Sequence, residues 1–318
     1  MSNILITGAR GFLGHHLTKE MVNDKLFTPT TSRLDLLRED AITNVVNYIS
    51  FHQIDTVIHL AAKCGGIGFN KELPGVLIHD NAKMGLNILE ACRIAKVNKV
   101  ITLGSICAYP KVPKTVPFVE SELFDGLPEE TNSYYGESKR LLLMMGQAYR
   151  KQYGINIIHL MPTNMFGEQD HFEREKSHVI PALLVKLQEA KEHNSPYVQL
   201  WGTGKASREF LYAGDCAKAI VLALNKYNGA EPVNIGTGTE ITISELANKI
   251  KEIVGYEGQI IWDPSKPDGQ PRRCLNTSRA KSVFDFEAKT SFDEGLRKTY
   301  EWFIDRWSNG TCPMRHCI

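Results

Sequence analysis

A glycine-rich turn that directly follows the first apolar run is the feature that most constrains the fold of this chain. The run Asn3–Thr7 predicts a buried strand, and the turn Gly8-Ala-Arg-Gly11-Phe-Leu-Gly14 opens a helix expected over 11–22. Glycines here let the backbone turn sharply and approach a pyrophosphate, whose charge lies on the helix N-terminus. A GxxGxxG spacing can also serve helix–strand packing alone. The prediction of nucleotide binding therefore depends on the position of this turn, directly after the first strand.

Short apolar runs alternate with amphipathic stretches through the first half of the chain. Further strands are expected at 55–61, 99–104 and 155–161, and helices at about 75–95 and 133–152. This alternation predicts an α/β fold, a Rossmann doubly wound parallel sheet covered on both faces by helices. Past residue 165 we expect a helix over 176–193, a strand near 197–201, a helix over 211–224, a strand over 233–235 and a loop over 263–273.

The 318 residues form neither internal repeats nor a linker rich enough to separate independent domains. We therefore expect a dinucleotide-binding Rossmann domain with a smaller α/β C-terminal substrate lobe, between which the chain crosses more than once. The Rossmann domain is expected to take residues 1–165 and about 211–236. The lobe is expected to take 166–210 and about 237–307, followed by a tail over 308–318.

Composition and charge exclude several classes of protein. Lys and Arg number 37 against 36 Asp and Glu, without a basic block, so no nucleic-acid partner is expected. Neither a signal peptide nor an apolar stretch of about 18 residues occurs, so no membrane partner is expected. Seven scattered cysteines predict reduced thiols in a cytoplasmic protein. Cys312, His316 and Cys317 are expected in a frayed end, and a metal site there is the less favoured interpretation.

A second strand of the sheet is expected between the helix at 11–22 and the strand at 55–61, and the residues at its end bear on the choice of nicotinamide cofactor. An acidic residue at the end of that strand would bind the ribose hydroxyl of NAD, but the stretch is Thr30-Thr31-Ser32-Arg33. Arg33, with Arg10 of the glycine turn, suits the 2′-phosphate of NADP. We therefore expect NADP(H), and the competing interpretation is that both arginines are solvated surface charges.

A Tyr and a Lys four residues apart form the second chemical signal. Tyr135 and Lys139 are expected on one face of a helix, and Ser105 at the carboxyl edge of the sheet, just after a strand. An ammonium nearby favours phenolate, so we expect the pKa of Tyr135 to fall from about 10 toward neutrality. Tyr135 can then exchange a proton with a substrate oxygen, which Ser105 also binds, while hydride moves at the same carbon.

With these residues placed, the chain resembles the extended short-chain dehydrogenase/reductases, and more closely the GDP-L-fucose synthase family, from residue 3 to about 305. The matching segments are 59–63, 65–67, 104–110, 131–132 with the pair Tyr135 and Lys139, 162–164, 177–181, 201–204, 208–210 and 266–272. The resemblance implies an NADPH-dependent epimerase-reductase acting on a GDP-4-keto-6-deoxy sugar, above all GDP-4-keto-6-deoxymannose, which it would convert to GDP-L-fucose.

The resemblance also implies which residues invert the carbons beside the keto group. A 4-keto group acidifies the protons at C3 and C5, and inversion needs a base and an acid on opposite faces of the ring. Cys107 and His178 would be this pair, a thiolate that removes a proton and an imidazolium that returns one. Tyr135 and Ser105 would stabilise the enolate oxygen. On residue chemistry alone, Cys107 could be a buried hydrophobe and His178 a helix cap.

Ligand contacts are carried over by the same resemblance. The expected NADP(H) contacts are Gly8, Arg10, Gly11, Phe12, Leu13, Gly14, Arg33, Asp35, Leu36, Leu60, Ala61, Ala62, Tyr135, Lys139, Pro162, Asn164 and His178. The expected GDP-sugar contacts are Asn164, Lys186, Trp201 and Arg208. Lys186 stands where the family commonly has Arg, Arg208 suits a bidentate grip on phosphate, and Trp201 could instead be only a core anchor.

Two departures from the family pattern leave related reactions open. Gly-Glu-Ser follows Tyr135 where small apolar residues are usual, and Ile106 replaces a small hydroxyl residue. A C5-epimerase/4-reductase or a plain 4-ketoreductase on a GDP-4-keto dideoxy sugar or heptose would use the same groups. A redox-neutral sugar 4-epimerase and a non-catalytic dinucleotide-binding protein also stay open, although Cys107 and His178 argue against the first of these.

The resemblance further implies a homodimer formed through the helices at about 75–95 and 133–152. Both helices carry apolar side chains, although the sheet can absorb much of this surface. The side chains in question are Met84, Ile88, Leu89, Leu142, Met144 and Met145.

Overall fold

Six parallel strands form the central sheet of the computed structural model, which describes residues 2–173, 177–266 and 268–312. The strands lie in the order β2-β1-β3-β4-β5-β9, and all neighbours are parallel. Their bounds are β1 Asn3–Thr7, β2 Lys25–Phe27, β3 Thr56–His59, β4 Lys99–Leu103, β5 Asn156–Pro162 and β9 Val233–Ile235. The order reverses between β1 and β3, the place where open α/β sheets bind ligands.

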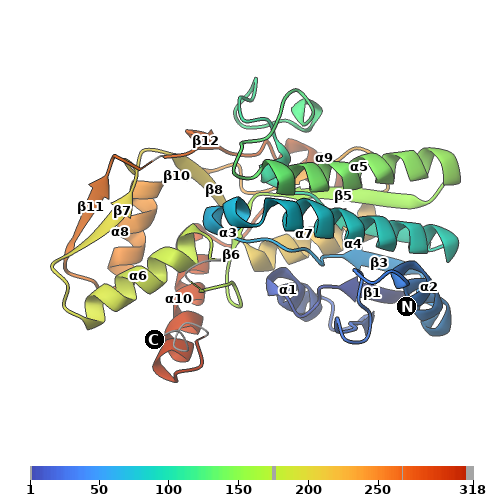
Figure 1. Cartoon of the computed structure of the whole chain (residues 1–318), viewed down its shortest axis with the longest axis horizontal. Helices are drawn as coiled ribbons and strands as arrows, with labels where there is room; N and C mark the ends of the chain where they lie inside the picture. The colour runs from blue at the N-terminus through green and yellow to red at the C-terminus, as the bar shows by residue number, and fades with distance from the viewer. Residues whose placement is uncertain (1, 174–176, 267, 313–318) are drawn as a thin grey trace.

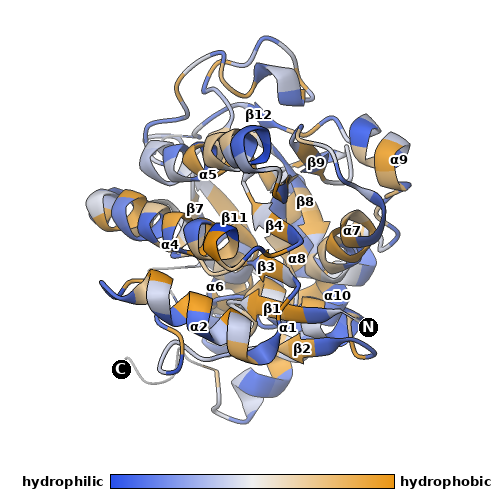
Figure 2. Ribbon diagram, turned by 90° about the vertical axis from the view of Figure 1, so that its right-hand side faces the viewer, coloured by the Kyte–Doolittle hydropathy of each residue, from blue (hydrophilic) through white to orange (hydrophobic). Residues whose placement is uncertain are grey.

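Successive side chains of each strand point to opposite faces of this sheet, and helices bury both faces. Ile4 and Ile6 pack on one face and Leu5 on the other. The first face is covered by α1 (Phe12–Glu20), α7 (Ala213–Lys226) and α9 (Ser278–Phe284), and the second by α2 (Ala41–His52), α4 (Pro74–Ile94) and α5 (Ser133–Tyr153). Figure 2 shows largely hydrophobic strands between these helices. The predicted doubly wound α/β fold is confirmed.

A smaller part of the chain, on the left of Figure 1, has its own sheets and core. β8 (Ser207–Tyr212) pairs with β6 (Asn164–Phe166), β10 (Glu240–Thr242) and β12 (Arg272–Arg273), and β7 (Tyr197–Trp201) pairs with β11 (Gln259–Asp263). The helices of this part are α6 (Val179–Glu192), α8 (Ile243–Val254) and α10 (Phe292–Ser308). Three short helices, α3 (Ile67–Glu72), η1 (Ile106–Ala108) and η2 (Glu120–Glu122), lie in connecting segments.

The expected strands and long helices are confirmed to within a few residues, but two expectations are wrong. Leu211 and Tyr212 end strand β8 instead of starting a helix, and α7 begins at Ala213. Segment 263–273 is not all loop, because Asp263 ends β11 and its last two residues form β12. These strands depend on partners distant in the chain, which a local pattern does not reveal. Residue 176 of the helix expected over 176–193 lies outside the described residues.

The division into a Rossmann domain and a lobe remains a proposal, with α9 moved to the Rossmann domain. Ala280, Phe284 and Phe286 pack in the core of the central sheet, although segment 237–307 was expected in the lobe.

The expected tail is partly ordered. Cys312 is buried in the core of the smaller part, so a frayed end is wrong for this residue. His316 and Cys317 lie outside the described residues. Across the described ranges, no helix is both long and apolar enough to span a lipid bilayer.

One buried carboxylate ties the smaller part to the central sheet. Glu209 of β8 accepts hydrogen bonds from the N–H groups of Thr237 at 2.6 Å, Gly238 at 2.8 Å and Leu275 at 2.7 Å. The first two donors follow β9 of the central sheet, and the third follows β12. Burial raises the pKa of Glu209 against the opposing effect of these donors. Glu209 therefore fixes β8, which carries Arg208, relative to the central sheet.

We predict that Glu209→Ala destabilises the fold by about 3 kcal/mol, because three backbone N–H groups, of which that of Leu275 is fully buried, lose a charged acceptor. Glu245→Ala is the matched control, since this carboxylate is exposed and forms a capping box with Thr242 at the start of α8. Its loss is expected to cost about 1 kcal/mol. Urea unfolding measures both, and equal shifts of the two midpoints would contradict the structural role of Glu209.

Candidate active site

The glycine turn lies at the reversal point of the central sheet, against the loop that follows β3. Gly8 has φ +73°, and a Cβ there would lie 2.7 Å from the nitrogen of Ala61. A Cβ on Gly14 would lie 2.3 Å from the oxygen of Gly8, so α1 packs tightly on the turn. Gly11 is the N-cap of α1, and as a glycine it has no side chain that could bond to the first N–H groups of the helix. The free N–H groups of this helix end suit a pyrophosphate.

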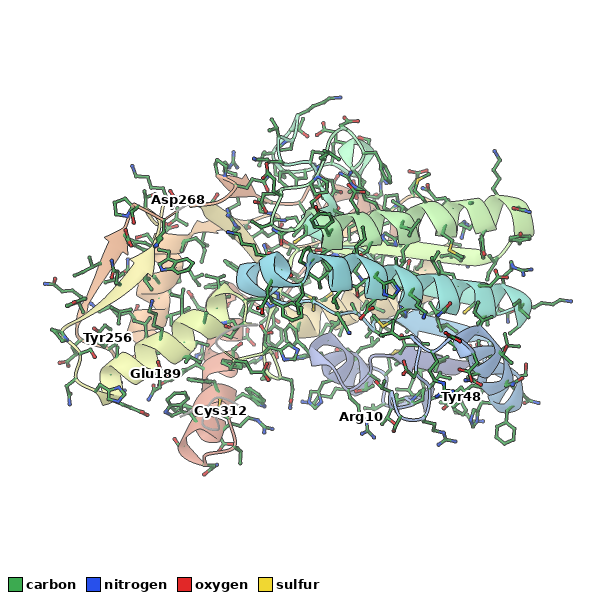
Figure 3. The ribbon with its side chains drawn as sticks, viewed as in Figure 1. Arg10, Tyr48, Glu189, Tyr256, Asp268 and Cys312 are labelled. Atoms are coloured by element: carbon green, nitrogen blue, oxygen red, sulfur yellow. The ribbon has the colours of Figure 1, made fainter. Side chains whose placement is uncertain are left out.

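Arg10 and Arg33 provide the positive charge expected for a 2′-phosphate. Both side chains are exposed, and neither forms an ion pair with any residue that the structure describes. The Arg33 guanidinium lies 5.8 Å from the ring centroid of Tyr48, beside a hollow of about 430 Å³ between α2 and the loop after β2. Figure 3 labels Arg10 and Tyr48 along the lower edge of the Rossmann domain.

The other expected cofactor contacts divide between this turn and the carboxyl ends of the neighbouring strands. Asp35 accepts a hydrogen bond from the N–H of Leu37 at 2.9 Å, and Leu36 is buried. Phe12 and Leu13 start α1, Leu60, Ala61 and Ala62 follow β3, and Pro162 ends β5. All of these positions fit a dinucleotide laid across the sheet edge.

A close backbone contact holds the start of α5 against the segment that follows β4. Ser105 caps η1 by accepting a hydrogen bond from the N–H of Cys107 at 3.1 Å. A Cβ on Gly136 would lie only 2.6 Å from the Cys107 carbonyl oxygen. A larger residue at 136 would push the helix away, so Gly136 allows the close contact between α5 and the segment of Cys107.

Burial controls the protonation of the Tyr–Lys pair. The Lys139 ammonium lies 5.5 Å from the Tyr135 ring centroid. Burial lowers the pKa of Lys139 to about 8, and burial, with the Cys64 and Cys107 thiols, raises the pKa of Tyr135 well above 10. The expected fall of the Tyr135 pKa is therefore wrong, because the desolvation of a phenolate outweighs this ammonium. Tyr135 keeps its proton at neutral pH and can donate it.

His178 lies at the N-terminus of α6, beside an aspartate that sequence reasoning missed. Its Nδ1 atom is 3.8 Å from Oδ1 of Asp170. Burial acts to lower the pKa of His178, but the hydrogen-bonding and charge interactions with Asp170 outweigh it and raise that pKa. Asp170 is itself buried, and its Oδ2 has no hydrogen-bond partner among the described residues. A helix N-terminus disfavours an imidazolium, so Asp170 supplies the compensating charge.

Cys64, in the loop after β3, is a second site residue that sequence reasoning missed. Its thiol interacts electrostatically with Lys139, Asp170 and Cys107, and desolvation by the surrounding protein raises its pKa. These interactions join the Tyr135 side of the site to the His178 side. The signal for Cys64 was its position after a parallel strand, whereas no local pattern marks Asp170. Within the described ranges, no three His, Cys, Asp or Glu side chains could together hold a metal ion.

The expected substrate contacts are only partly gathered. Arg208 is half-buried and interacts electrostatically with Cys107. Asn164 donates to the carbonyl of Glu209 at 3.0 Å. Lys186 donates to the carbonyl of Gln199 at 2.6 Å. Trp201 ends β7 and is 71% exposed, so it is not a core anchor.

The sequence of this chain is similar to a known protein family and to several of its members. The model of the NAD dependent epimerase/dehydratase family matches residues 4–236. The chain is 38% identical to the Probable GDP-L-fucose synthase 1 of Oryza sativa subsp. japonica, over 95% of this chain and 92% of that protein. It is 32% identical to the GDP-L-colitose synthase of Yersinia pseudotuberculosis, over 96% of this chain and 99% of that protein.

Two solved structures show the same overall fold. A GDP-L-fucose synthetase from Naegleria fowleri bound to NADP has a TM-score of 0.86 and 27% identity, covering 99% of this chain and 96% of that chain. A GDP-6-OMe-4-keto-L-xylo-heptose reductase from C. jejuni has a TM-score of 0.88 and 26% identity, covering 96% of this chain and 98% of that chain.

We predict that Arg33→Ala raises the Kd for NADPH by about 10- to 100-fold, the loss expected when a charged hydrogen-bond donor to phosphate is removed. The Kd for NADH should change little, because NADH lacks the 2′-phosphate. Arg38→Ala is the matched control, since Arg38 is exposed and already paired with Asp40 at 2.7 Å. Fluorescence titration with both cofactors measures the effect, and an equal loss for NADPH and NADH would disprove a contact with the 2′-phosphate.

Proposed function

The chain belongs to the NAD dependent epimerase/dehydratase family, and from that premise we propose that it is an NADPH-dependent epimerase-reductase acting on a GDP-4-keto-6-deoxy sugar. The conversion that we propose is that of GDP-4-keto-6-deoxymannose to GDP-L-fucose. Full-length similarity to GDP-L-fucose synthases of plants and bacteria supports this substrate. The cofactor is NADP(H), to which the glycine turn and the exposed Arg10 and Arg33 are suited.

One observation carries the proposal: groups suited to reduction and groups suited to inversion share one electrostatic cluster. Gly136, next to Tyr135, packs on the Cys107 carbonyl, and the Lys139 ammonium lies near the Tyr135 ring. Cys64 interacts electrostatically with Cys107 and with Asp170, the neighbour of His178. A plain reductase needs only a proton donor and its neighbours. The additional thiol and an imidazole with a raised pKa are explained by inversion at carbons next to the keto group.

In the reduction step the chain's own residues manage the proton. NADPH, when bound, supplies hydride for C4 of the sugar. Tyr135, kept protonated by burial, donates its proton to the C4 oxygen, and Lys139 stabilises the phenolate that remains. Ser105 is placed beside Cys107 at the end of β4 and hydrogen-bonds the same oxygen.

In the inversion steps Cys107 removes the proton at C3 or C5, and His178 returns one on the opposite face of the ring. The electrons of the broken C–H bond pass to the C4 oxygen, which Tyr135 and Ser105 stabilise as an enolate. Asp170 raises the pKa of His178 and so favours its charged form, although the N-terminus of helix α6 opposes that charge. On this proposal Cys107 is the base, His178 is the acid, and Tyr135 and Ser105 are the shared donors to the oxygen.

A narrower reaction is the second candidate. Similarity to a GDP-L-colitose synthase and to a GDP-heptose reductase favours C5 epimerisation with 4-reduction, or 4-reduction alone, on a GDP-4-keto dideoxy sugar or heptose. Ile106 between Ser105 and Cys107 is buried, so it does not by itself decide between these substrates.

We also propose that the protein acts in the cytoplasm as a homodimer through α4 and α5. These helices lie side by side (Figure 1). Met84, Ile88, Leu89 and Leu142 are buried within the chain and cannot serve the dimer. Three other side chains on these helices, Leu86, Leu141 and Met144, are 37%, 41% and 51% exposed and support such an interface.

Incubation with NADPH and GDP-4-keto-6-deoxymannose in deuterated water tests the proposed function. We expect oxidation of NADPH and deuterium at both C3 and C5 of the product, read by mass spectrometry and NMR. Deuterium at C5 alone, or at neither carbon, would favour the second candidate. Tyr135→Phe is expected to slow NADPH oxidation by at least about 100-fold, and unchanged turnover would refute the role of Tyr135.

We predict that Asp170→Asn slows deuterium exchange at C3 and C5 by about tenfold at pH 8, and less at pH 6. Asp170 raises the pKa of His178, so the substitution lowers that pKa. The charged imidazole is therefore lost at a lower pH in the variant, and its exchange rate begins to fall at a lower pH. Asp293→Asn, an exposed aspartate paired with Lys249, is the control.

A role through His178 also predicts non-additivity. Adding Asp170→Asn to a His178→Gln variant should slow the exchange no further. A further tenfold loss in that double variant would show that Asp170 acts independently of His178.

A further inference from the structure

Two arginines from segments far apart in sequence lie side by side in the smaller part. Arg273 of β12 is the register partner of Arg208 in the parallel pair of β12 and β8. Side chains of register partners point to the same face of a sheet, so both guanidinium groups lie on one face. Arg272, the preceding residue, points to the other face, where it pairs with Glu240.

Arg273 is buried and Arg208 is half-buried, and neither side chain forms an ion pair with any of the described residues. Arg273 is 9% exposed, and its Nε atom has no hydrogen-bond partner there. The only hydrogen bond of the Arg208 side chain within those residues goes to the Ser207 carbonyl at 2.6 Å. Burial, followed by the neighbouring charge of Arg273, lowers the pKa of Arg208 to about 10.

The two carboxylates that interact electrostatically with Arg208, those of Glu129 and Glu240, already have other partners. Glu129 accepts hydrogen bonds from Thr131 and Asn132. Glu240 accepts hydrogen bonds from Ser207 and Arg272, and Glu209 accepts from the three backbone N–H groups described above. Two like charges taken out of water without a counter-ion are costly, and the cost is offset when an anion binds between them. The pair is therefore built for a ligand with two or more negative charges.

We propose that Arg208 and Arg273 together grip the diphosphate of the nucleotide sugar, with Arg273 as the second arm of the grip. Planar guanidinium forks match phosphate oxygens in pairs. Arg208 interacts electrostatically with Cys107, so a diphosphate held here leaves the attached sugar beside the proposed base. This inference rests on the proposed function only in that the substrate is a nucleoside diphosphate sugar.

Calorimetric titration of the full chain, saturated with NADPH, with GDP and with GMP tests the inference. Arg273→Gln is expected to weaken GDP binding by about 10- to 100-fold and to reduce the preference for GDP over GMP. Arg272→Gln is the matched control, because it removes the same charge from the adjacent, exposed position. It should leave both affinities unchanged.

Binding of GDP by Arg273→Gln within about twofold of the unaltered protein, or an equal loss in Arg272→Gln, would overturn the inference. Arg273→Lys keeps the charge but loses the fork, so it should bind GDP several-fold more weakly, and unchanged binding would also count against the grip. This variant decides the question if Arg273→Gln does not fold, as judged by its melting curve. A preference of the unaltered protein for UDP would contradict the guanine part of the proposed function, while the dependence on Arg273 could still be measured with UDP.

Discussion

The parallel pairing of β1, β3, β4 and β5 is the constraint on which the rest of the site depends. Because these strands run in one direction, the segments after β1, β3 and β4 all emerge at one edge of the sheet. The glycine turn, Cys64, and the Ser105–Cys107 segment therefore meet there. The contact of Gly136 with the Cys107 carbonyl then adds α5, and with it Tyr135 and Lys139, to the same edge.

Desolvation sets the chemical state of this edge more than pairwise charge does. It raises the pKa of Tyr135 and Cys64 and lowers that of Lys139 and Arg208. His178 differs, because Asp170 reverses the effect of burial on its pKa. The result is one neutral proton donor and one imidazole with a raised pKa, a combination that suits reduction and inversion at adjacent carbons.

Helices and strands could be predicted where the pattern of their own apolar residues shows which faces are buried. Strands such as Asn3–Thr7, with apolar residues facing both ways, and long helices such as α5 follow from local pattern. β8 and the two-residue β12 do not, since each is stabilised by a partner distant in the chain. For the same reason Asp170 and Arg273 could not be predicted, because their importance depends on neighbours that no spacing in the sequence indicates.

The sequence by itself determined the family, the doubly wound sheet, the glycine turn and the identity of the groups able to carry the chemistry. Those follow from residue types and short spacings, which the chain carries before it folds. Only the tertiary structure decided the protonation of Tyr135, the partner of His178 and the pairing of Arg208 with Arg273. Each of these depends on burial and on through-space neighbours, and both arise only when the sheets and helices pack.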